Sequence, residues 1–414
     1  MRTANTRVVG PDAFGMKDEA LPIAHASSLS VELDELLRGA REYQLLALSP
    51  HTRRAYKVNW REFTGFCARY NFEPLPATPR TVELYLKWCA DMRHHEPMHD
   101  QRLIQHHDRD DCAHPNPLKI ASIEQRLATI ATIHKLNDLS SPTSTKTIEL
   151  TLEGIIGVHQ RERGGTPKIS LEADELRSLL NLIGTQRIDI RDRAILLLTF
   201  LGGMRRSEIA AMRIEDVTID ASGIVYRLRE SKTNRHGRQG VERKAIRRNT
   251  DPAFDPVRSY EEWLSVSGVR KQEVFRSLVH DVVGKPISGD DIRDIVRRRV
   301  LAKLCDWLAR NAAGDLIVAT LYRRAPDDTL TWFKARFSDA VLDELMVRFR
   351  LPETYDPRKF AAHSLRSGFV TSARAAGKAD YKIKEITGHR TDAMLDRYTH
   401  SQELWRDNAS SDLL

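Results

Sequence analysis

Cysteine is scarce in this 414-residue sequence, which contains Cys67, Cys89, Cys112 and Cys305. No two of them stand at CxxC spacing, and four in so long a chain make no disulfide framework. This scarcity argues against the small secreted proteins that depend on disulfides, and it fits a reducing compartment. The longest apolar run, Ala194 to Met204, is interrupted by Thr199 and two glycines and is too short for a membrane span.

The N-terminal stretch MRTANTRVVGPDAFGMKDEA lacks the compact apolar block of a secretory signal. We therefore expect a cytoplasmic protein without a membrane partner. The chain is too long for one comfortable hydrophobic core, so two domains are expected.

Positive charge is concentrated in one part of the chain. The whole sequence has 65 Lys and Arg against 57 Asp and Glu, a formal net charge of +8. Nine of these basic residues, with only two glutamates, fall between Arg227 and Arg248. An ordinary solvated hairpin could have this composition. A surface that follows the phosphates of a nucleic acid would have it too.

Helical apolar spacing dominates residues 31–163, where no strand pattern stands out. We predict an all-helical first domain there, preceded by a loose arm over residues 1–30 that lacks sustained periodicity. The segment Gln160 to Lys168 has the composition of a linker, and we place the boundary there, with a second domain over residues 164–414. The predicted helices of the first domain are 31–48, 50–70, 78–92, 120–137 and 143–160.

A polar segment rich in histidine separates the third and fourth of these helices. Residues 94–114 contain six histidines and Cys112, which raises the question of a zinc site. Structural zinc sites repeat a fixed spacing between paired ligands, and no such spacing recurs here. We predict no metal site and interpret the segment as a long loop.

The second domain is expected to be mainly α-helical with a small antiparallel sheet. A capped amphipathic helix, ISLEADELRSLLNLI, and a buried helix that ends at glycine, RDRAILLLTFLGGM, come first. From Arg213 onward, strand-like runs alternate with Gly and Asn turns and predict one hairpin sheet. Helices resume at about Pro256 and at Ser288, where a serine cap precedes two acids.

Four short blocks of this domain supply what metal-free cleavage of a phosphodiester requires. The reaction needs a nucleophile, cations around the oxygens of the transition state and an acid for the leaving oxygen. In ITGHRTDAMLDRYTH, His389 and Tyr398 are nine residues apart, and in AAHSLRSG, His363 and Arg366 are three apart. Residues three apart share a helix face, so an imidazole and a guanidinium can converge on one phosphate. The other two blocks are GGMRRSEI, with Arg205, and RESKTN, with Lys232.

Taken alone, each of these residues is more often an ordinary surface or core side chain. In this order, however, the blocks resemble the catalytic signature of the tyrosine recombinases of the Cre and Xer type, the phage integrase family. The resemblance covers Leu171 to about Ser401, and the preceding helices resemble the core-binding domain of the family more loosely. It implies the tyrosine recombinase fold and a catalytic set: Arg205, Glu208, Lys232, His363, Arg366, His389 and Tyr398.

The resemblance also implies a role for each residue. Tyr398 would attack phosphorus and form a covalent 3′-phosphotyrosine, with its phenol activated by nearby cations and by His363 as the candidate base. Arg205 and Arg366 would clamp the non-bridging oxygens, which a planar guanidinium does better than an ammonium. Lys232 would protonate the departing 5′ oxygen.

His389 would donate a hydrogen bond to the phosphoryl group, and Glu208 would orient the arginine or a histidine. The phosphotyrosine stores the energy of the broken bond, so neither ATP, a metal nor another cofactor is expected. The chain departs from the family by an insertion at about residues 305–356. We interpret it as a longer surface excursion, with an extra DNA or subunit contact as the alternative.

The partner that the resemblance implies is double-stranded DNA with a specific target site. A protein that is monomeric in solution would bind two duplexes as a homotetramer and act through a Holliday junction. The alternatives are a type IB topoisomerase-like or hairpin telomere resolvase activity and a catalytically idle DNA-binding relative. A compact core-binding domain followed directly by the catalytic domain favours a site-specific recombinase over the first two alternatives. An idle relative would usually lack an arginine or the tyrosine, and none is missing. We expect the recombinase in the prokaryotic cytoplasm. We predict DNA contacts at Arg53, Arg54, Lys57, Arg235, Arg238, Lys244, Arg297 and Arg298.

Overall fold

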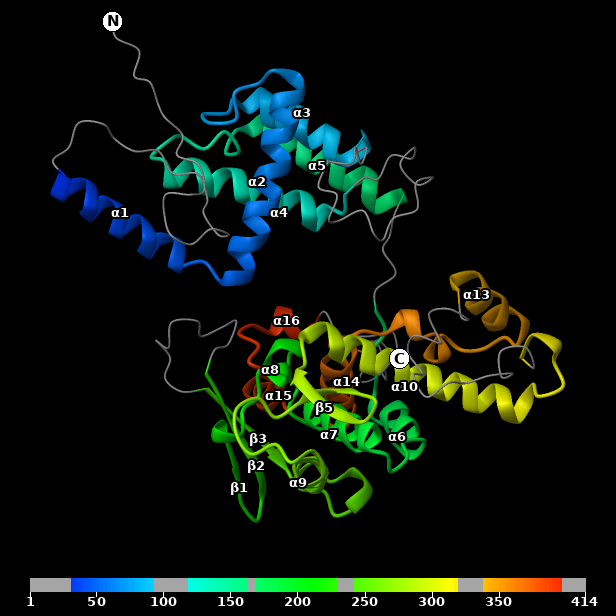
Figure 1. Ribbon diagram of the computed structural model, residues 1–414. Coiled ribbons are helices and arrows are strands. Elements are labelled where there is room, and N and C mark those ends of the chain that lie inside the picture. The colour runs from blue at the N-terminus through cyan, green and yellow to red at the C-terminus, as the bar shows by residue number, and fades with distance from the viewer. Residues whose placement is uncertain (1–30, 93–117, 163–167, 230–241, 319–337, 397–414) are drawn as a thin grey trace, which may run out of the picture. The chain divides into compact units, whose positions relative to one another are not determined.

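The chain folds into two compact units, Met1–Gly165 and Thr166–Leu414 (Figure 1). The structure is a computed structural model, and the residues it describes are 31–92, 118–162, 168–229, 242–318 and 338–396. The predicted arm and the histidine-rich loop lie outside these residues. The division between the units falls inside the segment that we interpreted as a linker. Among the described helices, none combines the length and apolar character needed to cross a membrane.

The described part of the first unit is helical, as predicted. Two of its helices begin at hydroxyl caps: Ser49 Oγ accepts from the backbone N–H of Thr52 at 3.0 Å, and Thr78 Oγ1 accepts from that of Thr81 at 3.1 Å. A proline follows each cap, at a position whose N–H needs no helical partner. The elements are α1 (Val31–Leu46), α2 (Pro50–Tyr70), α3 (Pro79–Lys87) with a π turn at Trp88–Met92, α4 (Ile120–Leu136) and α5 (Lys146–Glu162).

An aromatic core holds α2, α3 and α4 together. The ring of Tyr85 lies 5.0 Å from the ring of Phe63 and 5.2 Å from that of Phe66. The buried phenol oxygen of Tyr85 accepts a hydrogen bond from Arg126 at 2.6 Å, and Arg126 also pairs with Glu62 at 2.7 Å. Arg126 thus links the phenol of Tyr85 to the carboxylate of Glu62 inside this core.

A neutral histidine joins α4 to the turn before α3. The buried His134 accepts a hydrogen bond from the backbone N–H of Ala77 at its Nε2 atom, at 2.9 Å. Its Nδ1 atom lies 2.9 Å from the carbonyl of Ile130, which can only accept. The ring must therefore carry its proton on Nδ1. Burial lowers the pKa of His134, against a smaller opposing effect of the bond to Ile130.

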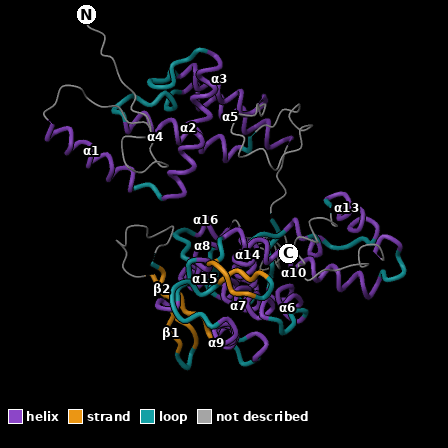
Figure 2. Tube along the Cα trace, in the orientation of Figure 1, coloured by secondary structure: helices purple, strands orange, loops and turns teal. Residues whose placement is uncertain are grey.

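The second unit is mainly helical with small antiparallel strands, which confirms the predicted fold class (Figure 2). Strands β1, β2 and β3 form one sheet in that order, with Tyr226 opposite Lys244. The elements are α6 (Ala173–Asn181), α7 (Arg187–Leu201), α8 (Arg206–Ala210), β1 (Val217–Ile219), β2 (Gly223–Leu228), β3 (Glu242–Arg247), α9 (Pro256–Ser267), β4 (Arg276–Val279), β5 (Val282–Pro286), α10 (Gly289–Asn311), α13 (Asp339–Arg348), α14 (Ala362–Ala375), α15 (Asp380–Thr387) and α16 (Asp392–Asp396).

The prediction of a single hairpin was wrong, because β4 and β5 form a second one. The turn between them places His280 at φ 48° and Asp281 at φ 61°. Two successive residues with positive φ make the tight turn that suits the twist of a hairpin. A His-Asp pair signals such a turn much more weakly than Asn-Gly does, so the sequence pattern did not reveal it.

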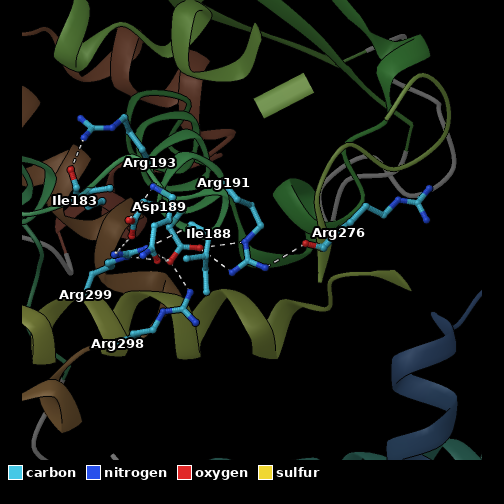
Figure 3. A network of polar contacts seen from close by, with 10 residues as sticks. Ile183, Ile188, Asp189, Arg191, Arg193, Arg276, Arg298 and Arg299 are labelled. Atoms are coloured by element: carbon cyan, nitrogen blue, oxygen red, sulfur yellow. Dashed lines mark hydrogen bonds and ion pairs between the residues drawn. The ribbon is translucent and has the colours of Figure 1, made fainter. Parts of the chain in front are cut away.

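Helix α7 is buried along most of its length and is bonded to α10 through an ionic network (Figure 3). Asp192 on α7 has no exposed surface, and it pairs with Arg191 at 2.8 Å, with Arg299 at 2.7 Å and with Arg298. Burial alone raises the pKa of this carboxyl, but the guanidinium groups of Arg298, Arg299 and Arg191 bring it down to about 2. The network fixes the helix whose end forms the functional site.

The predicted insertion contains a small core of its own. The C-terminal half of α10 and α13 bury apolar side chains against each other, including Leu304, Leu308, Leu342 and Leu345. Trp307 contributes an edge contact to Phe349, with ring centroids 5.7 Å apart. The described part of the insertion is therefore a packed helical extension of α10 and not an irregular surface loop.

Candidate active site

The centre of the site is the glycine turn that ends α7. Gly203 has φ +50°, and a Cβ atom there would lie 2.9 Å from Thr387 Cγ2 and 3.2 Å from Phe369 Cδ1. Only glycine permits both this backbone conformation and so close an approach of α14 and α15. Helix α7 thus contacts α8 and α14, and α14 contacts α15 (Figure 1).

Arg205 and Glu208 form a closed pair directly after this turn. The backbone N–H of Arg205 donates to Glu208 Oε2 at 2.9 Å, and Arg205 Nη1 donates to Glu208 Oε1 at 2.6 Å. The carboxylate of Glu208 is almost fully buried, whereas the guanidinium is one-fifth exposed. Glu208 therefore holds one edge of the guanidinium, and the other edge remains for a ligand.

Arg366 is buried on α14, with 1% of its surface exposed. Its Nη1 atom donates to the carbonyl of Gly203 at 2.6 Å, and its Nη2 atom lies 2.9 Å from His389 Nε2. A second glycine brings α14 into place, because a Cβ atom at Gly368 would fall 1.7 Å from the carbonyl oxygen of Leu171. Arg366 thus connects the glycine turn to the histidine that follows α15.

Two contacts assign one tautomer to His389. Arginine can only donate, so Nε2 accepts from Arg366. The hydroxyl of Thr387 donates to the carbonyl of Ile383 at 2.7 Å, so at 2.9 Å it accepts from His389 Nδ1–H. Burial and the positive charges of Arg366 and Arg205 lower the pKa of His389 to about 3. The ring is therefore neutral near pH 7.

His363 lies on α14 one turn before Arg366 and is exposed at the surface. Surrounding protein atoms remove part of its hydration, and this is the main cause that lowers its pKa. The positive charges of Arg366 and Arg205 lower it further. A neutral imidazole that remains open to solvent is the state that a general base requires. The HxxR spacing thus places a candidate base beside a buried cation, as expected from the helix period.

Lys244 is a member of the site that the sequence did not identify as such. It is 1% exposed, and its Nζ atom lies 3.6 Å from Glu208 Oε2 and 3.2 Å from the carbonyl of Gly202. It also donates to the carbonyl of Ile386. We expected Lys244 to contact DNA phosphates at the surface, but it is directed inward.

The structure brings together five of the seven predicted catalytic residues. Lys232 and Tyr398 lie outside the described residues. The charged groups of the described site are two guanidinium groups, one ammonium and one carboxylate, accompanied by two imidazoles. Such a set can bind a phosphodiester and stabilise the additional negative charge that develops on its oxygens during displacement at phosphorus.

The predicted DNA contacts have different surroundings. On α2, Arg54 is exposed, whereas Arg53 and Lys57 are partly buried. Arg297 donates to the carbonyl of Phe360 at 3.2 Å, and Arg298 belongs to the Asp192 network. Two arginines that we expected to face phosphates are therefore bonded within the protein. Arg235 and Arg238 lie outside the described residues.

Comparison with known proteins finds a family match within the second unit. Residues 170–306 match the model of the phage integrase family. This segment of the chain belongs to the phage integrase family. The resemblance to tyrosine recombinases that we inferred from the residues is thereby confirmed.

Relatives extend the similarity beyond the integrase segment. The integrase/recombinase XerD homolog of Selenomonas ruminantium is 23% identical over 369 residues, which are 87% of this chain and 84% of the relative. Recombinase Cre of Escherichia phage P1 is 24% identical over 229 residues, 54% of this chain and 57% of the relative. The integrase of transposon Tn1549, solved in complex with transposon right end DNA, is 14% identical with a TM-score of 0.49, covering 90% of this chain and 99% of that one.

Proposed function

We propose that this protein is a site-specific tyrosine recombinase, which cleaves and rejoins DNA through a covalent 3′-phosphotyrosine. One observation carries the proposal: Arg205, Arg366 and His389, which are far apart in the sequence, meet at the glycine turn of α7. The integrase segment and the recombinase relatives support the same activity.

In the proposed reaction the phenol oxygen of Tyr398 forms a bond to phosphorus, and the bond from phosphorus to the 5′ oxygen breaks. His363 takes the phenol proton, and Lys232 gives a proton to the departing 5′ oxygen. Arg205 and Arg366 bind the non-bridging oxygens. The reverse reaction with a 5′ hydroxyl of a second strand completes the exchange.

Glu208 and His389 support this chemistry without changing covalent partners. Glu208 fixes Arg205 through two hydrogen bonds, one from its backbone N–H and one from its guanidinium. For His389 to donate a hydrogen bond to a phosphoryl group that comes between its ring and Arg366, Nε2 must first acquire a proton, either from Nδ1 through a change of tautomer or from outside the ring. In the described state both of its ring nitrogens have protein partners, so DNA binding must rearrange at least one contact.

The assembly belongs to the same proposal. We assign residues 31–163 to a DNA-clamping domain and residues 164–414 to the catalytic domain. Four copies would act on two duplexes through a Holliday junction in the prokaryotic cytoplasm, with no metal or other cofactor. For contacts to DNA phosphates, Arg54 is the most exposed of the described candidates on α2.

The test is the covalent adduct. A binding site is first selected from random duplexes, and a nicked substrate is built on it so that cleavage cannot be reversed. We expect an adduct that survives denaturation, forms equally in EDTA and is absent in Tyr398→Phe. An adduct that persists in Tyr398→Phe, or that requires a divalent ion, would contradict the proposal. Rejoining only to the original strand would indicate a topoisomerase instead.

A further inference from the structure

Lys244 joins three elements of the site from a strand whose other basic residues point outward. Along β3 the side chains alternate, with Lys244 and Ile246 buried and Arg243 and Arg247 exposed. The ammonium group contacts Glu208 on α8, the carbonyl of Gly202 at the end of α7, and the carbonyl of Ile386 on α15.

We propose that Lys244 is a positioning residue of the cleavage reaction, whose ammonium group ties the end of α15, and with it His389, to the Arg205–Glu208 pair. The kinetic consequence of this tie rests on the proposed recombinase function. Ile386 precedes His389 by only three residues, so the bond to its carbonyl restrains the segment from which the imidazole projects.

The partners of Lys244 indicate positioning and not proton transfer. A protonated lysine has three N–H groups and no acceptor. Lys244 Nζ donates to the carbonyls of Gly202 and Ile386 and lies at ion-pair distance, 3.6 Å, from Glu208 Oε2. All three oxygens belong to the protein, and Lys244 is 1% exposed. An apolar replacement would remove a donor from the two carbonyls and the positive partner from Glu208, whose Oε2 atom would keep the N–H of Arg205.

The charges around Lys244 make the tie dependent on pH. Burial, and then the positive charges of Arg366 and Arg205, lower its pKa to about 8, whereas Glu208 and Glu242 oppose this shift. The charge of Lys244 in turn contributes to the lowered pKa of His389, which is neutral. Above pH 8 the amine is neutral and loses its ion pair with Glu208, so the tie between α15 and the Arg205–Glu208 pair weakens there.

The first experiment compares Lys244→Met with Lys303→Met in single-turnover cleavage of the nicked substrate. Lys303 is the matched control, because it is also a buried lysine of the second unit and pairs with Glu175, on α6. We expect Lys244→Met to slow cleavage by roughly 100-fold, the cost of a misplaced reacting group, with unchanged DNA affinity. Lys303→Met should cleave at the wild-type rate. Wild-type cleavage by Lys244→Met would overturn the inference.

Lys244→Arg covers the case in which the methionine variant does not fold. Its guanidinium does not titrate near pH 8. We expect the ratio of cleavage rates at pH 9 and pH 7 to be lower in the wild-type protein than in Lys244→Arg. Any pH effect of Lys232 or Tyr398 would change this ratio equally in both proteins, so it would not contribute to the difference between them. Equal ratios would refute the tie.

Hydrogen exchange separates this inference from the proposed function. In Lys244→Met, we expect the amides of Thr387 to His389 to exchange roughly tenfold faster than in the wild-type protein, after correction for intrinsic rates. At pH 9, we expect the same difference between the wild-type protein and Lys244→Arg. If no DNA adduct ever forms, the recombinase proposal fails, while faster exchange still supports the tie. Unchanged exchange at the end of α15 overturns the tie, whatever the activity.

Discussion

At the scale of single residues, the placement of His389 depends on a hydroxyl two residues before it. Thr387 is fully buried, and its hydroxyl donates to Ile383 and accepts from His389 Nδ1–H. The side chain therefore selects the tautomer whose Nε2 lone pair faces Arg366. This selection matters because a histidine can donate to a phosphate only from a protonated nitrogen.

Replacing Thr387 by valine should change the tautomer of His389 with little change in shape. Valine has no oxygen to accept the Nδ1–H bond, so we expect the Nδ1–H form to lose population to the Nε2–H form. Nitrogen-15 chemical shifts of the His389 ring measure this ratio directly. Thr387→Ser retains the acceptor and should keep the wild-type tautomer. A valine variant with an unchanged ratio would mean that other contacts fix the ring.

The residues of the site were largely visible in the sequence, because each belongs to a short block with its own chemistry. Arg205, His363 and Arg366 could be identified before any geometry was known. Lys244 could not, because it is one of nine basic residues in one stretch and charge alone indicates a surface. The one available signal was its position two residues before Ile246, on the inward face of a strand.

At the scale of elements, the close packing of α14 depends on a missing side chain. Gly368 lies where the chain at Leu171 passes over the helix, and a Cβ atom would overlap the Leu171 carbonyl at 1.7 Å. The clash is with backbone, so rotation of a side chain cannot relieve it. The helix that carries His363 and Arg366 can therefore approach this segment only with glycine at this position.

Gly368→Ala should destabilise the second unit by at least about 2 kcal/mol, the range of overpacked core substitutions. Urea denaturation of the full chain, followed by the hydrogen exchange of amides in each unit, measures the loss. Gly154→Ala is the control, since a Cβ atom there meets nothing within 4 Å. This helical substitution should stabilise the first unit by about 0.5–1 kcal/mol. Equal stability of Gly368→Ala and wild type would contradict the packing described.

Helix positions were predicted well because their ends are encoded locally. The caps at Ser49 and Thr78 and the stop at Gly268 can be read from neighbouring residues. The second hairpin was missed, because strand pairing depends on contacts between elements. The ion pair of Arg298 was missed for the same reason, since its partner Asp192 is about one hundred residues away in the chain.

At the scale of the whole molecule, lowering the pH should decrease the free energy of unfolding of both units, because each contains histidines that the fold keeps neutral. Burial is the main cause that lowers the pKa of His134 and His389, and crowding with nearby cations lowers that of His363. At pH values between these lowered pKa values and about 6.5, the ordinary pKa of histidine, the unfolded chain binds more protons than the folded one. The stabilisation is therefore complete above pH 6.5 and is lost as the pH falls.

We expect the urea midpoint of the first unit to decrease between pH 7.5 and pH 5.5. His134→Gln should reduce this dependence, because glutamine can both accept from Ala77 and donate to Ile130 but does not titrate. Equilibrium unfolding in urea, followed by the hydrogen exchange of amides in α2 and α4, is the measurement. An identical pH dependence in wild type and His134→Gln would assign the effect to other groups.

The segment that leaves the linker is bonded directly to the helix with the HxxR block. The N–H of Ile169 donates to the carbonyl of Lys359 at 3.1 Å, and that of Leu171 donates to Ser364 at 2.8 Å. Ser364 is the immediate neighbour of His363. A displacement of Leu171 would therefore act on the residue next to the candidate base, so the first residues of the second unit help to hold His363 in place.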